Sequence, residues 1–403
     1  MVNVFLIVHD FSGVKTYIDE LSEFLSKKRD VFVFKIYLEF PDFKEFRIQQ
    51  RGKIKSIYIP DKVSKEYNKK YYKRAAQLVY FHFNELKNVV FHANMPEQYF
   101  FIQEIKKFYQ CPVVFTFHFL MSFYSFCDKV SGYDSDSNHN GNALEKFMLE
   151  DSDHIICVTK FSKRAITQLR KIDPTKTSVI YNGKSWSIIS TGVNANLKIK
   201  YGFLPTDRII LYVGKLEQRK GIDILIGAFM LIKEKFTTTK LVIVGDGEYN
   251  NYLPLANDCI GRIHFTGNLG KNKVNDFYSL AEMGVIPSQY EQCSYVAIEM
   301  MQYKLPMIIS DVPGLNELVI HMKSGLVSNS RLHKTIPFTI EADEVDLASK
   351  IEFFLEHPFE AKRFAQEAYN CGIKFHAIDR MGNETLKIYR HLNLKSKKNF
   401  ILD

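Results

Sequence analysis

Short apolar runs alternate with longer amphipathic segments along most of the chain. The runs that predict buried strands are VNVFLIVHD, VFVFKIYL, IKSIYIP, VVFHAN, PVVFTFHFL, HIICVTK and SVIYNG in the first half, and RIILYVGKL, KLVIVGDG, RIHFTGNL, MGVIPSQ, PMIISD and GLVSNS in the second. Helical stretches lie between most of them, beginning with Val14–Lys27. Continuously apolar strands are expected where helices cover both faces of a parallel sheet. The pattern therefore predicts an α/β fold with two doubly wound, Rossmann-like sheets.

The alternation is interrupted by one weakly patterned segment, Lys184–Thr206. We predict an N-terminal domain over residues 1–190, a linker over 191–206, a C-terminal domain over 207–375 and a closing segment over 376–403. The closing segment contains a helix near Asp379–Leu392 and a basic tail at Lys395–Lys398, which we expect to fray. In such folds ligands bind at the carboxyl ends of the strands, and the cleft between two domains is the natural site.

Length and composition fit a soluble two-domain protein with anionic partners. The chain has 403 residues, which is too long for one ordinary core, and its formal charge is +9. That charge favours nucleotides, sugar phosphates, acidic lipid or nucleic acid without choosing among them. Six scattered cysteines without a CxxC pair argue against a disulfide framework or a zinc site. With no signal-peptide core and no apolar span, we expect a cytoplasmic protein.

The loop GKLEQRKG places three cations after the predicted strand RIILYV and before a predicted helix. These are Lys215, Arg219 and Lys220. Two phosphates held at the carboxyl edge of a sheet lose hydration and need paired positive charge. A solvated basic loop is the common alternative, but the position after a strand favours phosphate binding.

The stretch YEQCSYVAIEMMQYKLP carries two carboxylates at the next informative junction. Glu291 lies in the loop after the strand MGVIPSQ, and the helix is predicted to start near Ser294. The amides of Ser294 and Tyr295 then provide a helix N-terminus on which a diphosphate can sit. Glu291 would accept hydrogen bonds from sugar hydroxyls, and Glu299 would reach a ribose. The purely structural alternative is that Glu291 is a surface glutamate before the helix and that Glu299 forms a salt bridge within it.

Four further loops carry weaker signals. Gly13 lets the chain turn closely into a helix after the first strand, although an ordinary tight turn explains it as well. His118 ends the strand PVVFTFHFL and can meet a sugar hydroxyl, whereas the alternative is a core histidine bonded to backbone. Asn182-Gly183 fits a turn. Gly245-Asp246-Gly247 would permit close approach of a nucleotide base, although it is not a dinucleotide fingerprint.

Together these residues resemble the retaining glycosyltransferases of the GT-B fold, often called glycosyltransferase group 1. The resemblance rests on Glu291-x7-Glu299, Pro306 and the Gly314–Glu317 turn, with GKLEQRKG upstream. It is strong over residues 205–325 and weaker before, where SGVKTY, FTFHF and VIYNG carry it. The chain departs from the family pattern at Ser12, Lys215, Gln292-Cys293-Ser294 and Leu305, but no departure removes a charged role.

The resemblance implies a site and a reaction. Lys215 and Lys220 would hold the donor diphosphate with help from Arg219, and the amides near Ser294 and Tyr295 would cap it. Glu299 would bind the ribose and Glu291 the transferred sugar. His118 would touch the sugar or the acceptor, and Gly13 would lie near the phosphate and the acceptor. The N-terminal domain would bind the acceptor, the C-terminal domain would bind the nucleotide sugar, and the last helix would cross back.

The resulting hypothesis is a retaining hexosyltransferase that moves sugar from a UDP- or GDP-sugar to a hydroxyl in glycan or glycoconjugate biosynthesis. The acceptor classes left open are a carbohydrate, a lipid-linked glycan, a peptide and a small molecule. Two alternatives remain: a GT-B-like nucleotide-sugar epimerase and a non-catalytic nucleotide-sugar-binding partner of another transferase. We expect no cofactor and no nucleic-acid partner, because the cations are dispersed and no nucleic-acid-binding motif is present.

Metal and membrane contacts are the last two questions that the sequence raises. Asp134-Ser135-Asp136 and Asp151-Ser152-Asp153 both spell DxD, but we interpret them as turn and cap residues and expect no metal. The stretch Lys65–Lys87 is basic and aromatic and would allow peripheral contact with the inner face of an anionic membrane. A packed amphipathic helix with a solvated basic face is the favoured alternative.

Overall fold

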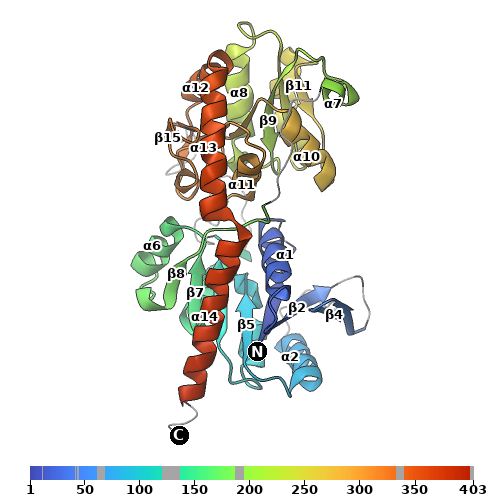
Figure 1. Ribbon diagram of the computed structural model, residues 1–403, viewed down its shortest axis with the longest axis vertical. Helices are drawn as coiled ribbons and strands as arrows, with labels where there is room; N and C mark the ends of the chain where they lie inside the picture. Colours follow the sequence, from blue (N-terminus) through green and yellow to red (C-terminus); the bar gives the residue numbers. More distant parts are fainter. Residues whose placement is uncertain are drawn as a thin grey trace. The chain divides into compact units, whose positions relative to one another are not determined.

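The computed structural model describes residues 1–10, 12–40, 42, 45–60, 69–119, 137–186, 195–332 and 340–399. The chain divides into two units (Figure 1). The first comprises Met1–Ser185 and Ala377–Asp403, and the second comprises Trp186–His376. The sequence pattern predicts boundaries at 190 and 375, and the division into two units falls after Ser185 and after His376.

The first unit is built on an eight-stranded sheet in the order β3-β4-β2-β1-β5-β6-β7-β8. Its strands are β1 (Val2–Val8), β2 (Val31–Phe40), β3 (Arg47–Arg51), β4 (Ile54–Pro60), β5 (Val89–Ala93), β6 (Val113–Phe117), β7 (His154–Cys157) and β8 (Thr177–Val179). Its helices are α1 (Ser12–Ser26), α2 (Lys69–Phe83), α3 (Tyr99–Ile105), α5 (Ser137–Asp151), α6 (Lys160–Leu169) and α14 (Ile378–Asn399). All seven residues of β1 are buried, as a central strand covered on both faces requires.

Strand β3 is absent from the sequence prediction. Its five residues, RIQQR, are all exposed, and it pairs antiparallel with β4 at the edge of the sheet. A polar edge strand has no apolar signature, because hydrogen bonds to its neighbour hold it rather than burial.

Helix α14 packs against α1 within the first unit (Figure 1). A Cβ added at Gly382 would lie 2.1 Å from the ring of Phe24, so the two helices approach closely. The Ile378 amide donates to the Lys184 carbonyl (2.9 Å), and Arg380 donates to the Tyr181 carbonyl. The helix continues to Asn399, so the basic tail expected to fray is helical instead.

The second unit contains a six-stranded parallel sheet in the order β11-β10-β9-β12-β13-β14. Its strands are β9 (Arg208–Val213), β10 (Thr239–Val244), β11 (Ile263–Phe265), β12 (Met283–Ile286), β13 (Met307–Ser310) and β14 (Leu326–Ser328), and β15 (Ser330–Leu332) pairs antiparallel with β16 (Ile340–Ala342). Its helices are α7 (Ala195–Lys200), α8 (Ile222–Ile232), α9 (Tyr249–Tyr252), α10 (Lys271–Leu280), α11 (Tyr295–Gln302), α12 (Glu344–Glu356) and α13 (Pro358–His376). The predicted strand GLVSNS corresponds to β14 and the start of β15.

Both sheets confirm the predicted α/β class with Rossmann-like parallel order. In each sheet the strand order reverses direction at the first strand: β1 lies between β2 and β5, and β9 lies between β10 and β12. In open parallel sheets such a switch point opens a crevice at the carboxyl ends of the strands, where ligands bind. The loops after β1 and β5, and after β9 and β12, are therefore the positions at which functional side chains gather.

Candidate functional site

In the second unit, the loops after β9 and β12 are joined to each other. The two strands are neighbours in the sheet, so both loops emerge at the same carboxyl edge. The Gln289 amide donates to the Arg219 carbonyl over 2.8 Å. This bond links the loop that carries the cations to the loop that carries Glu291.

Gly221 lets the two loops approach. It has φ +65° and ψ 31°, which is the left-handed region, and it stands immediately before α8. A Cβ at this position would lie 2.1 Å from the Pro287 carbonyl oxygen, at the start of the β12–α11 loop. Both the backbone conformation and the close contact require glycine.

Lys220 and Glu291 form an ion pair between these loops. Lys220 Nζ lies 2.5 Å from Glu291 Oε1, and the side chains are only 20% and 18% exposed. Ser288 also donates to Glu291 Oε1, over 3.4 Å. Two residues predicted to act on the same ligand are thus in direct contact, and the pair is shielded enough from water for its charges to interact strongly.

The other two cations of the loop interact with Glu217. Arg219 pairs with its Oε2, and Lys215 Nζ lies 3.7 Å from its Oε1. The sequence analysis did not predict this role of Glu217, although the residue is a carboxylate within the motif GKLEQRKG. The loop therefore supplies its own carboxylate, which an incoming anion must displace or share.

Helix α11 begins where the sequence predicts. Ser294 is its N-cap residue, and Ser294 Oγ accepts from the Ala297 amide over 3.5 Å. Tyr295 is the first helical residue, so the positive end of the helix dipole follows Glu291 by four residues in the chain. The first turn of α11 carries no acidic residue that would neutralise that end.

Glu299 is held by a tyrosine from the preceding helix. The buried Tyr278 on α10 donates its hydroxyl proton to Glu299 Oε2 over 2.9 Å. Burial, with the nearby Glu299 carboxylate, raises the pKa of Tyr278 well above its usual value, so the phenol remains a donor. No local pattern links a tyrosine to a glutamate 21 positions later, which is why the sequence reading missed Tyr278.

Gly245-Asp246-Gly247 is packed against the β9–α8 loop. The Gly214 amide donates to the Val244 carbonyl and the Leu216 amide to the Asp246 carbonyl. A Cβ at Gly245 would lie 1.7 Å from the Gly214 carbonyl oxygen. What approaches this glycine closely is the β9–α8 loop, so crowding by the protein itself accounts for it.

In the first unit, His118 lies just beyond the carboxyl end of β6. Its Nε2 is 3.2 Å from Asn94 Oδ1, and the ring of Tyr17 packs edge-on against it with centroids 4.8 Å apart. Burial lowers the pKa of His118 to about 3, so the imidazole is neutral near pH 7. Among the described residues its hydrogen-bond partner is the Asn94 side chain, whereas the core-histidine alternative expected a backbone partner. Asn94 ends the predicted strand VVFHAN but was not identified as a partner.

A series of buried polar side chains is linked by hydrogen bonds behind Tyr17, the residue that packs on His118. His92 Nδ1 is 2.5 Å from the Tyr389 hydroxyl on α14, and its Nε2 is 2.6 Å from Thr116 Oγ1. Thr116 Oγ1 in turn lies 3.1 Å from the Tyr17 hydroxyl. The series therefore connects α14 to the tyrosine that packs on His118.

This network predicts acid sensitivity of the first unit. Burial, with a smaller contribution from His118, lowers the pKa of His92 from 6.5 to about 3. Below pH 6.5 the unfolded chain binds a proton that the folded chain excludes, so stability falls with pH by about 1.4 kcal/mol per unit for this group. From pH 7 to pH 5 the loss should be about 2 kcal/mol.

Urea unfolding of the wild type and of His92→Gln at both pH values measures the effect of this group. The amide can still donate and accept, but it does not titrate. We expect the variant to lose about 2 kcal/mol less than the wild type on acidification. Equal losses in the two proteins would show that His92 is not responsible.

Three other features named in the sequence analysis are Gly13, Gly183 and the stretch that forms helix α2. Gly13 lies in the first turn of α1, and a Cβ there would meet no atom within 4 Å, so packing does not require glycine. Gly183 packs against Met381, whose sulfur accepts from its amide over 3.0 Å. Helix α2 buries Tyr72, Ala75, Ala76, Val79 and Phe83, as the packed-helix alternative predicts.

Of the two DxD sequences, residues 134–136 lie outside the described residues, while residues 151–153 are structural. Asp151 Oδ2 accepts from the Tyr99 hydroxyl (2.6 Å), and Asp153 Oδ2 accepts from the Val113 amide (2.8 Å).

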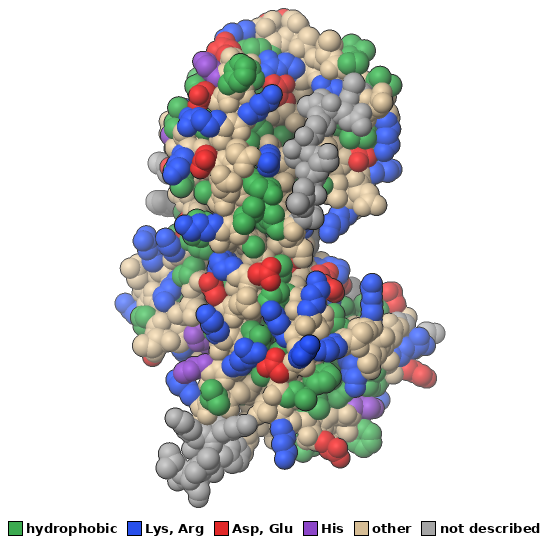
Figure 2. Space-filling view, in the orientation of Figure 1, with side chains coloured by type: hydrophobic (Ala, Val, Ile, Leu, Met, Phe, Trp, Pro, Cys, Tyr) green, Lys and Arg blue, Asp and Glu red, His purple; other side chains and the backbone are tan. Residues whose placement is uncertain are grey.

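Lys and Arg side chains are interspersed with acidic ones over the face seen in Figure 2. Within the described ranges, no helix is both long and apolar enough to cross a membrane.

Residues 194–370 match the family described as glycosyl transferases group 1, and residues 11–184 match glycosyltransferase family 4. An uncharacterised glycosyltransferase of Methanocaldococcus jannaschii is 28% identical over 65% of this chain and 66% of its own length. Across the first curated relatives, the match spans half to two thirds of their length.

Two solved structures show the same fold over nearly the whole chain. Sucrose-phosphate synthase from Thermosynechococcus elongatus has a TM-score of 0.79 at 19% identity, covering 97% of this chain and 99% of that one. HepE of Anabaena, solved with UDP-glucose, has a TM-score of 0.74 at 16% identity, covering 97% and 100%.

Proposed function

We propose that this chain, whose two halves match the models of glycosyltransferase family 4 and of glycosyl transferases group 1, transfers a hexosyl-type sugar from a UDP- or GDP-sugar to a hydroxyl acceptor with retention of configuration. The observation that carries the proposal is the Lys220–Glu291 pair, held between two joined loops at the carboxyl edge of the second sheet. A cation suited to phosphate and a carboxylate suited to sugar hydroxyls are side by side in this pair, which supports the proposal. A place in glycan or glycoconjugate biosynthesis follows as part of the same proposal.

The donor diphosphate binds the β9–α8 loop and the N-terminus of α11. Lys220, Arg219 and Lys215 supply the positive charge, and Ser294 and Tyr295 bring the helix terminus to the phosphate. In the unliganded chain these cations interact with Glu217 and Glu291. A diphosphate therefore competes with two carboxylates for these cations.

The sugars of the donor are recognised by the two glutamates. Glu291 lies beside Lys220 and accepts hydrogen bonds from the transferred sugar. Glu299 accepts from Tyr278 at Oε2, which fixes the orientation of the carboxylate, and the proposal assigns it to the ribose. Fixing a carboxylate before the ligand binds lowers the entropic cost of recognition.

In the transfer step, the bond between the sugar C1 and the β-phosphate oxygen breaks, and its electron pair stays on that oxygen. The acceptor hydroxyl oxygen forms the new bond to C1 on the same face, and its proton moves to the departing phosphate. Lys220 and the α11 terminus stabilise the charge that builds on the phosphate, which is where fixed electrostatic groups contribute most. The first unit binds the acceptor, with His118 as a neutral hydrogen-bonding group, and the absence of a side chain at Gly13 leaves the first turn of α1 open.

A thermal-shift screen with UDP-, GDP- and ADP-sugars tests the proposal. A ligand that binds only the folded state raises the melting temperature, so one nucleotide class should stabilise the second unit selectively. UDP-sugars are the first to try, because the similar fold of HepE is solved with UDP-glucose. Absence of a shift with every nucleotide sugar, together with absence of turnover, would refute the donor assignment.

We predict that EDTA leaves the transfer rate unchanged. The carboxylates of Asp151 and Asp153 are engaged by Tyr99 and by the Val113 amide, and the proposed phosphate charge balance comes from lysine and arginine. Rates measured with and without EDTA, and after addition of Mg²⁺ or Mn²⁺, check this. Loss of activity in EDTA that a metal restores would contradict it.

A further inference from the structure

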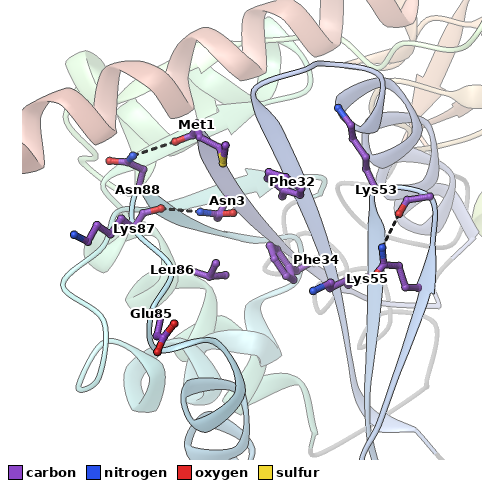
Figure 3. A pocket seen from close by; sticks show the side chains of 12 residues that line it. Met1, Asn3, Phe32, Phe34, Lys53, Lys55, Glu85, Leu86, Lys87 and Asn88 are labelled. Carbon is purple, nitrogen blue, oxygen red and sulfur yellow. Dashed lines mark hydrogen bonds between the residues drawn. The ribbon is translucent and has the colours of Figure 1, made fainter.

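A pocket of about 500 Å³ opens in the first unit between the β3–β4 hairpin and the loop that follows α2 (Figure 3). Its lining is contributed by Met1, Asn3, Phe32, Phe34, Gln50, Gly52, Lys53, Lys55, Glu85, Leu86, Lys87 and Asn88. This volume lies within the range of small-molecule sites, about 300–1,000 Å³. The pocket belongs to the amino end of the sheet, because Asn3 and Phe32 stand near the starts of β1 and β2.

The pocket exists because α2 covers only part of one sheet face. The helix ends at Phe83, whose ring packs on Phe34 with centroids 5.1 Å apart. Phe32 lies two residues before Phe34, on the same face of β2, and remains 36% exposed beyond the end of the helix. Figure 3 shows the two rings facing the loop that carries Leu86 and Lys87. An exposed aromatic ring thus forms part of the floor of a concave site.

The walls are positively charged. Three lysines and one glutamate line the pocket, which leaves two formal positive charges on its side chains. Lys53 Nζ donates to the Lys28 carbonyl over 2.9 Å, which holds that wall in place. Lys55 Nζ lies 5.9 Å from the Phe34 ring centroid and 6.0 Å from that of Phe83, so it stands over the aromatic floor. A dianion with a flat ring matches both the charge and the floor.

We propose that this pocket binds a ring-bearing phosphate monoester of small-metabolite size, with the ring on Phe32 and the phosphate at Lys55, whose ammonium group stands over the aromatic floor. The phosphate dianion balances the two formal charges of the lining, and the ring covers apolar surface that is otherwise in water. The site is separate from His118, because the pocket lies at the amino ends of β1 and β2 and His118 follows the carboxyl end of β6, which is parallel to them. Five residues from Asn3 to Val8 span about 16 Å.

Calorimetric titration of the whole chain with phenyl phosphate tests the proposal, with inorganic phosphate and phenol as matched probes. We expect phenyl phosphate to bind at least about tenfold more tightly than either, because it makes both kinds of contact. Phe32→Ser and Lys55→Gln should each weaken it by about tenfold, through loss of the ring contact and of the charged contact respectively. Unchanged melting temperatures establish that these variants fold.

Two control variants locate the binding. Phe81→Ser removes a ring that is 76% exposed on α2 but lies outside the lining, and Lys220→Ala removes the cation of the proposed donor site. Both should bind phenyl phosphate as the wild type does. The proposal fails if phenyl phosphate binds no better than inorganic phosphate, if Phe32→Ser binds normally, or if Lys220→Ala alone abolishes binding. The last result would assign phenyl phosphate binding to the second unit, and the proposed transfer reaction would be unaffected.

Discussion

Lys220→Ala is expected to lower the turnover number by about a hundredfold or more, which is the cost of losing one fixed donor to a developing oxyanion. Lys220 is only 20% exposed and is held 2.5 Å from Glu291, so its ammonium group is positioned before the ligand arrives. Neither Lys215 nor Arg219 can replace it without moving, because both interact with Glu217. Steady-state kinetics with the donor identified by thermal shift measure the effect.

The variant also leaves Glu291 without its lysine partner, so stability must be measured beside activity. Lys235→Ala is the matched control, since Lys235 in the same unit pairs with Glu352 and Glu356 through an exposed side chain. It should retain the wild-type rate. If Lys220→Ala folds normally and keeps nearly the full rate, Lys220 does not stabilise the departing phosphate, and the assigned donor site is wrong.

Gly221→Ala is expected to destabilise the second unit by about 3 kcal/mol and to reduce donor turnover. A left-handed conformation costs an alanine about 1–2 kcal/mol, and displacing the Pro287 carbonyl from a 2.1 Å contact adds about 1–3 kcal/mol. Relief of that contact requires the β9–α8 and β12–α11 loops to separate. Separation of the loops would pull Lys220 away from Glu291. Nucleotide binding should therefore weaken together with the stability of the second unit.

Gly202→Ala provides a control for the backbone term alone. Gly202 has φ +81° in the same unit, but a Cβ there would meet no atom within 4 Å. Chemical denaturation should therefore show a loss of about 1–2 kcal/mol and an unchanged rate for this variant. Equal losses for the two variants would mean that the contact with Pro287 relaxes at no cost, and that the loops are not held together by it.

Most of the fold could be predicted because it follows from local pattern. The strands β1, β9 and β12 are continuous apolar runs, and burial between two helical layers leaves no other arrangement for them. Strand β3 could not be predicted, since its polar residues carry no burial signal. The positions of Lys220 and Glu291 at one edge were also predictable, because every loop that follows a parallel strand emerges at the carboxyl end of the sheet.

The partners of these residues could not be predicted, since pairing depends on which loops are neighbours. Residues 220 and 291 lie 71 positions apart and meet only because β12 is placed next to β9. The same holds for Glu299 with Tyr278 on α10, and for His118 with Asn94 at the end of β5. At Gly245 the sequence shows a glycine, but it does not show the Gly214 carbonyl that makes glycine necessary there.

The α/β class, the two sheets, the start of α11 at its serine cap and the presence of cations and carboxylates in two loops could all be predicted from the amino-acid sequence. These features depend on periodicity and on interactions within a few residues. Three features emerge only from the folded chain: which cation meets which carboxylate, the pairing of Glu217 with Lys215 and Arg219, and the aromatic pocket left uncovered beyond α2. Such outcomes depend on distances between segments far apart in the chain, and no local pattern encodes them.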